Sequence, residues 1–114
     1  MNKVFIVNRS GHNFTSAKEY GELIYLSEGM MDRYAITSIY RQFSEGMKDS
    51  QENDYIVLTG LASMCSVATA IFAFKHGRIN LLLYKNNRYI ERQLIIGELK
   101  VNTDNAVSHF DNKE

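Results

Sequence analysis

The sequence predicts an α/β fold: a compact, Rossmann-like, mostly parallel sheet of about five strands, with helices on its faces and a C-terminal antiparallel hairpin. Three observations support this prediction. Four short apolar runs are continuous rather than alternating, as in strands that are buried on both faces. Two segments between these runs carry an apolar stripe at helical spacing. Two adjacent asparagines then separate the last two runs, and such pairs favour tight hairpin turns.

The apolar runs place the first four strands in order along the chain. They are KVFIV (3–7), ELIYL (22–26), DYIVL (54–58) and INLLLY (79–84). A short helical turn over 15–20 connects the first two strands. It is capped by Asn13 or Thr15 and ends before Gly21.

Two longer helices connect the later strands. The first covers about 35–48, because apolar residues recur there at the i, i+3, i+4, i+7 spacing. Its stripe consists of Ile36, Ile39, Tyr40, Phe43 and Met47. The second covers 63–76, with Ser63 as its N-cap, basic residues in its last turn and Gly77 directly after it.

The C-terminal part begins with the turn at Asn86 and Asn87, which pairs the fourth strand with YIERQLII (89–96) in an antiparallel hairpin. The sequence after this strand is polar and shows no clear periodicity. We therefore expect a single α/β domain over 1–100 and a polar, flexible tail over 101–114.

Composition excludes several classes of function. Thirteen basic residues balance thirteen acidic ones, which disfavours sequence-independent nucleic-acid binding. Cys65 is the single cysteine and has no partner for an internal disulfide, which favours a reducing cytoplasm. No apolar stretch approaches the ~18 residues of a membrane span. The sequence has no dinucleotide fingerprint, Walker lysine or metal-ligand spacing, so we expect no cofactor and no metal.

Polar loops follow the first three strands, and the carboxyl ends of parallel strands meet at one edge of a sheet. These loops offer hydrogen-bond donors, a fixed cation and small hydroxyl groups, which suit a phosphate, a ribose or a base edge. The candidate ligand-binding residues there are Asn8, Arg9, Ser10, His12, Ser27, Glu28, Thr59 and Ser63. The alternative is that these residue types follow strands only because turns need them.

Two further interpretations concern charge. His12 with Glu28 could act as a general acid and base if the protein is an enzyme. Basic residues gather over 75–92 and acidic ones over 45–54, so these segments could meet in a homo-oligomer. Alternatively, a neighbouring subunit could bring basic side chains to an anionic ligand; the candidates are Arg78, Arg88 and Arg92.

Three segments carry a resemblance to a known group of proteins. KVFIVNRSGH, YGELIYLSEG and KHGRINLLLYKNNRYIER are similar to small bacteriophage-encoded proteins over most of 3–96. This resemblance implies a phage accessory protein in the bacterial cytoplasm and brings no catalytic residues. More loosely, a first strand followed by Gly11 and His12 resembles the viral ring nucleases. That family carries its Gly-His pair after a later strand, where this chain has Thr59 and Gly60.

The resemblance implies a role against host defence, as is common for phage accessory proteins of this size. We therefore expect a non-catalytic protein that sequesters a nucleotide-derived immune signal in a polar pocket. One alternative is an inhibitor that binds a host defence protein through an exposed face including Tyr34, Tyr40 and the acidic run near Glu52. The other is a small phosphodiesterase or glycosidase that uses His12 and Glu28.

Overall fold

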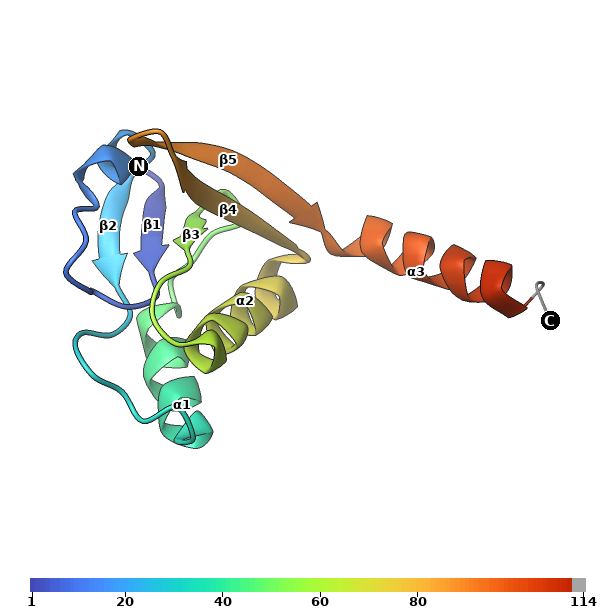
Figure 1. Cartoon of the computed structure of the whole chain (residues 1–114), viewed down its shortest axis with the longest axis horizontal. Coiled ribbons are helices and arrows are strands. Elements are labelled where there is room, and N and C mark those ends of the chain that lie inside the picture. Colours follow the sequence, from blue (N-terminus) through green and yellow to red (C-terminus); the bar gives the residue numbers. More distant parts are fainter. Residues whose placement is uncertain (112–114) are drawn as a thin grey trace.

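A computed structural model describes residues 1–111, and its centre is a five-stranded sheet in the order β2-β1-β3-β4-β5 (Figure 1). The strands are β1 (Lys3–Ile6), β2 (Glu22–Tyr25), β3 (Tyr55–Val57), β4 (Arg78–Lys85) and β5 (Arg88–Ile95). The first four strands run parallel, and β5 pairs antiparallel with β4. The predicted fold class is confirmed.

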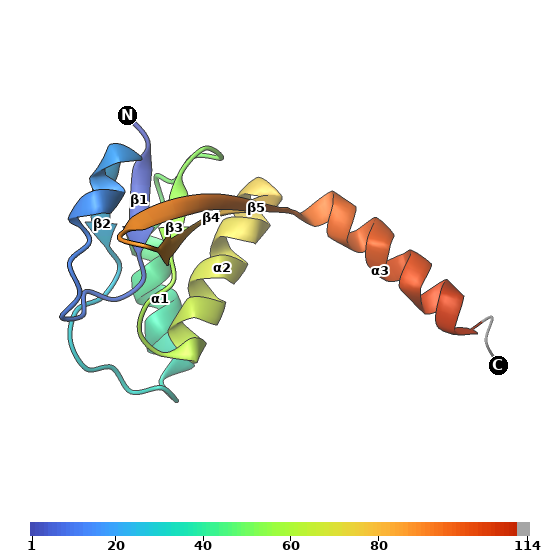
Figure 2. The same ribbon diagram turned by 45° about the horizontal axis from the view of Figure 1, so that its top comes forward.

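The helices are divided between the two faces of the sheet. The helices α1 (Ile36–Gly46) and α2 (Ala62–His76) pack together on one face, and the short 3₁₀ helix η1 (Thr15–Glu19) covers part of the other (Figures 1 and 2). Parallel crossovers are right-handed. In the strand order, β2 lies on one side of β1, whereas β3 and β4 follow on the other side. The two directions therefore place η1 and the α-helices on opposite faces.

Successive residues of β1 enter two different cores, as the two-residue period of a strand requires. Phe5 packs in the core beneath α1 and α2, which also contains Phe43 and Phe72. Val4 and Ile6 point to the η1 face. Both sides of β1 are buried, which explains why its sequence is continuously apolar.

The predicted turns are confirmed, and two predicted caps are wrong. The N-cap of η1 is Phe14 rather than Asn13 or Thr15, although Asn13 Oδ1 accepts from the Thr15 amide at 2.8 Å. Asn86 and Asn87 have φ angles of 53° and 65°, and Gly77 ends α2 with a φ of 67°. Ser63 is not the N-cap of α2, because the helix begins earlier. The Cys65 amide already donates to the carbonyl of Leu61 at 3.1 Å, so Leu61 is the N-cap.

The chain after β5 forms a helix, α3 (Ile96–Asp111), which projects away from the sheet (Figures 1 and 2). Residues 101–111 of the predicted polar, flexible tail form most of this helix, and 112–114 lie outside the described residues. The flexibility of the tail stays a prediction. Ile96, Leu99, Thr103 and Ala106 follow helical spacing. The first residue of this stripe, Ile96, belongs to the strand predicted over 89–96. The polar segment from residue 102 therefore shows no clear helical pattern by itself. The domain boundary near residue 100 stays a prediction.

His76, in the last turn of α2, gives a testable pH dependence. Its Nε2 lies 2.8 Å from Ser50 Oγ. Burial, aided by the positive charge of Lys75, lowers its pKa, while Asp54 and Glu52 oppose the shift. The unfolded chain therefore takes up a proton near pH 6.5, before the folded protein does, so acidification through this range costs stability. We expect His76→Gln to lose less stability than the wild type between about pH 7 and pH 5 in urea unfolding. Equal losses would contradict this assignment.

Candidate functional site

The site expected from the sequence lies where the chain changes direction across the sheet. The loop after β1 leads to η1 on one face, whereas the loop after β3 leads to α2 on the other. Adjacent strands whose loops leave in opposite directions create a crevice at their carboxyl ends, and ligands of open α/β sheets bind in such crevices. In this chain the crevice falls between β1 and β3.

Two clefts open at this edge. The larger, which we call the sheet cleft, has a volume of about 350 Å³ and lies on the η1 side. It is lined by His12, Asn13, Phe14, Val57, Leu58, Thr59, Leu82, Leu83, Tyr84 and Tyr89. The second, the helix cleft, has a volume of about 290 Å³ and lies beside the start of α2. It is lined by Asn8, Gly29, Met30, Met31, Arg33, Gly60, Leu61 and Met64.

Asn8 joins the three polar loops. It is 4% exposed, and its Nδ2 donates to Ser27 Oγ and to the Gly29 carbonyl, each at 3.0 Å. Ser27 Oγ in turn donates to the Val7 carbonyl at 2.6 Å. Thr59 Oγ1 accepts from the Asn8 amide at 3.0 Å and donates to its carbonyl at 2.7 Å. These predicted binding residues therefore fix the loops to one another.

Gly60 allows the loop after β3 to approach this network. Its φ of +87° lies in the left-handed region that favours glycine. A Cβ at this position would lie 2.8 Å from Asn8 Cβ and 2.6 Å from Met64 Cε. The close contact between the β1 and β3 loops thus depends on a residue without a side chain.

Arg9 and Glu28 lie together at this edge but do not line either cleft. Their backbones form a parallel bridge, and the Arg9 amide donates to the Ser27 carbonyl at 2.8 Å. The guanidinium of Arg9 lies 4.9 Å from the ring centroid of Tyr25, a cation–π distance. Arg9 thereby extends the pairing of the first two strands.

His12 lines the sheet cleft, with its ring 6.3 Å from that of Phe14 in an edge-to-face arrangement. Within residues 1–111, no hydrogen bond or ion pair links His12 to Glu28. Ser10 Oγ and Ser63 Oγ are buried without a hydrogen-bond partner in the same described region. His12 and Glu28, the proposed acid and base, lie at the same edge of the sheet but make no contact with each other.

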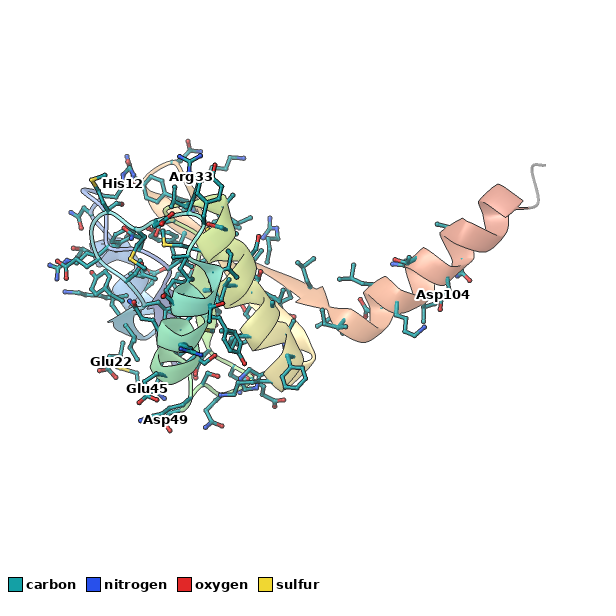
Figure 3. The ribbon with its side chains drawn as sticks, turned by 90° about the horizontal axis from the view of Figure 1, so that it is seen from below. His12, Glu22, Arg33, Glu45, Asp49 and Asp104 are labelled. Carbon is teal, nitrogen blue, oxygen red and sulfur yellow. The ribbon has the colours of Figure 1, made fainter. Side chains whose placement is uncertain are left out.

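The sequence did not indicate Arg33 as a site residue. It is exposed and lines both the helix cleft and a hollow of about 250 Å³ beside Ser63. Figure 3 shows His12 and Arg33 at one end of the globule and the labelled carboxylates of Glu22, Glu45 and Asp49 at the opposite end. Arg33 has no motif around it, so only the topology reveals its position.

The family comparison concerns the same part of the chain. The model of the phage Pam3 gp32-like protein family matches residues 2–96. The chain belongs to this family. The matched range contains the whole sheet and every residue that lines the two clefts, and it ends at the first residue of α3. The match links the chain to bacteriophage proteins. No curated protein and no solved structure gives a significant match.

The predicted arginines of this gp32-like protein are spread along its last two strands. Arg78 begins β4 at the edge opposite the clefts, where its Nε donates to Asn80 Oδ1 at 3.1 Å. Arg88 begins β5 next to the hairpin turn, and Arg92 lies in the middle of that strand, opposite Leu81. Within one chain these three side chains do not gather around either cleft, and their binding role stays a prediction.

The basic and acidic segments of the gp32-like chain already meet within one molecule. Lys75 Nζ donates to the carbonyls of Met47 at 2.7 Å and of Lys48 at 2.9 Å. Asn80 Nδ2 donates to the Glu52 carbonyl at 2.7 Å. These contacts join the segment after α1 to the last turn of α2 and to β4, at the edge of the sheet opposite the clefts.

The remaining chemical groups offer little reactivity. Burial raises the pKa of the Cys65 thiol, and Sγ donates to the Thr59 carbonyl at 3.5 Å. Among the described residues, no three His, Cys, Asp or Glu side chains are close enough to hold a metal ion. Over the same residues, no helix has the length and apolar character needed to cross a membrane.

Proposed function

We propose that this phage protein binds and sequesters a nucleotide-derived small molecule, such as a signal of host immunity, without converting it. The sheet cleft is the observation that supports this function. Its volume of about 350 Å³ is within the range of small-molecule sites, and it lies at the switch point where α/β folds bind ligands. Its lining is mainly apolar and aromatic, with polar groups from His12, Asn13 and Thr59.

The aromatic side chains suit a nucleobase. Tyr84 is exposed, and its ring lies 5.2 Å from that of the buried Tyr89 in an edge-to-face pair. The Tyr84 hydroxyl is 3.1 Å from Asn87 Oδ1, to which it donates, so the hairpin turn holds this ring in place. Stacking a base on an aromatic ring contributes about 1–3 kcal/mol.

The neighbouring helix cleft suits a negatively charged group. Leu61, the N-cap of α2, lines this cleft, and the first turn of a helix presents free amides and a positive partial charge. Arg33 adds a full positive charge to the same cleft. We infer that phosphate groups of the ligand approach this side while its base occupies the sheet cleft.

Binding without catalysis agrees with the contacts at this edge. The side chains of Asn8, Ser27 and Thr59 are engaged in mutual hydrogen bonds that hold the loops in place. His12 faces the sheet cleft, whereas Glu28 does not line it. A preformed cleft with fixed walls is sufficient for sequestration.

The test measures retention of a nucleotide. Purified protein is incubated with a mixture of cyclic and linear oligonucleotide signals, separated from free ligand and heat-denatured, and the released molecules are identified by mass spectrometry. We expect one intact nucleotide from the wild type and at least about fivefold less from Tyr84→Ala, because one stacking contact of about 1–3 kcal/mol is lost. Tyr84 is exposed, so circular dichroism should show an intact fold in this variant.

Two outcomes would contradict sequestration. A nucleotide that is consumed, and is spared by His12→Ala, would assign catalysis to the sheet cleft. Recovery of no nucleotide at all would favour the alternative in which the protein binds a host defence protein.

A further inference from the structure

Another hollow lies on the outer side of α1 and α2 and shares no lining residue with the two clefts. We call it the helix-pair groove; its volume is about 690 Å³. It is lined by Ile36, Thr37, Tyr40, Ser44, Lys48, Val67, Ala70, Ile71, Phe74 and Lys75. Phe74 is 92% exposed and Tyr40 is 55% exposed. A contiguous apolar surface of this kind marks an interaction site.

The helix α3 has an apolar stripe without a core to cover it. Ile96 and Leu99 are 37% and 42% exposed, and Thr103 and Ala106 continue the same face at helical spacing. Figures 1 and 2 both show α3 extending away from the sheet and from the α1–α2 layer. The helix therefore offers a ridge that matches an apolar groove.

We propose that the helix-pair groove is occupied by α3 of a second copy of this chain, and that each copy both gives and receives a helix. Such an exchange is a self-complementary twofold interface, in which the same two surfaces are used twice. An amphipathic helix lying in an apolar groove is a common mode of recognition. The 16 residues of α3 give a length of about 24 Å, long enough to follow the 11-residue α1 along the groove.

The junction between β5 and α3 favours a second copy over the same chain. The strand ends at Ile95 and the helix begins at Ile96, so no loop residues are available to reverse the chain. The Ile96 amide also donates to the Gly77 carbonyl at 3.0 Å, which fixes the first residue of α3 beside the end of α2. The direction of α3 is thus set by the sheet, and its stripe is presented to another molecule.

The charges of the two surfaces are complementary. The groove carries Lys75, in the last turn of α2, and Lys48, which follows the end of α1 and pairs with Glu45 at 2.7 Å. Among the residues of α3 whose side chains the structure describes, Lys100 pairs with Asp104 at 3.1 Å, so Glu98 makes this part of the helix net negative, whereas the lysines give the groove positive charge. This difference supports docking of α3 and opposes docking of a basic partner.

The first experiment measures molar mass by light scattering during size-exclusion chromatography. We expect a dimer for the full chain and a monomer for both Leu99→Asp and Phe74→Asp, since each places a charge in the apolar contact. Val101→Asp is the matched control, because Val101 is 58% exposed on the opposite face of α3 and should leave the dimer intact. A monomeric wild type, or equal effects of the Leu99 and Val101 variants, would overturn the proposal.

A second experiment identifies the occupant of the groove. In a Cys65→Ala background, Phe74→Cys combined with Leu99→Cys is oxidised and run on a non-reducing gel. We expect a covalent dimer that requires both cysteines. A disulfide within one chain would show that α3 folds onto its own groove, and a dimer from Leu99→Cys alone would show that two α3 helices pair with each other. Either result overturns the proposal.

Discussion

Replacement of Asn8 by aspartate is expected to lower the free energy of unfolding by about 3–5 kcal/mol, the cost of an uncompensated buried charge. Aspartate has nearly the same shape as asparagine, but it has no amide hydrogens to donate. Its carboxylate would face the Gly29 carbonyl and Ser27 Oγ, whose hydroxyl hydrogen is already donated to Val7. Asn8 is 4% exposed, so water cannot solvate the new charge. The three loops should then separate.

The measurement is urea unfolding followed by circular dichroism. Asn13→Asp is the matched control, because Asn13 is exposed and uses only Oδ1, which accepts from the Thr15 amide. Aspartate keeps this acceptor, so the control should unfold close to the wild-type midpoint. Asn8→Ala should cost less than Asn8→Asp, about 1–3 kcal/mol, because it removes the donors without burying a charge. Equal midpoints for the two aspartate variants would refute the role of Asn8 as the residue that joins the loops.

The elements of the sheet were predictable because their signals are local. Continuous apolar runs identify buried strands, and the two asparagines at 86 and 87 identify the hairpin turn with its positive φ angles. The handedness of crossovers then determines which helix covers which face. The helix α3 was missed because Ile96, which begins its apolar stripe, was assigned to the last strand. The remaining polar sequence has weak helical amphipathicity.

The sequence predicts where the candidate residues gather in the fold, but not which contacts they make. Asn8, Ser27 and Thr59 do lie at one edge, as the topology requires. Their hydrogen bonds with one another join residues 19 and 51 positions apart, and no local pattern contains that information. Buried polar groups need hydrogen-bond partners within the protein. The buried side chains of Asn8 and Ser27 therefore hold the loops together. Tyr84 and Tyr89, on the two strands of the hairpin, form part of the wall of the sheet cleft. Their positions depend on the register of β4 with β5.

Leu58→Glu is expected to abolish retention of the nucleotide by the sheet cleft. Leu58 follows the last residue of β3, lines this cleft and is 39% exposed, so the fold should tolerate a polar side chain there. A carboxylate at this position removes apolar contact area and repels a phosphate-bearing ligand. Each tenfold loss of affinity corresponds to about 1.4 kcal/mol, and we expect at least about two such factors.

Leu58→Gln separates the loss of apolar contact from the charge repulsion, because glutamine has nearly the same shape as glutamate and no charge. If an anionic nucleotide occupies the cleft, the glutamine variant should retain more of it than the glutamate variant, and added salt should narrow the difference by screening the repulsion. Val101→Glu, on α3, controls for the added charge on the protein and should bind like the wild type. Equal binding by the Leu58 variants would mean that no negative group of the ligand lies near the carboxyl end of β3. Since the phosphate position inferred from Arg33 and the start of α2 adjoins that strand end, such a result would contradict the proposed orientation of the ligand.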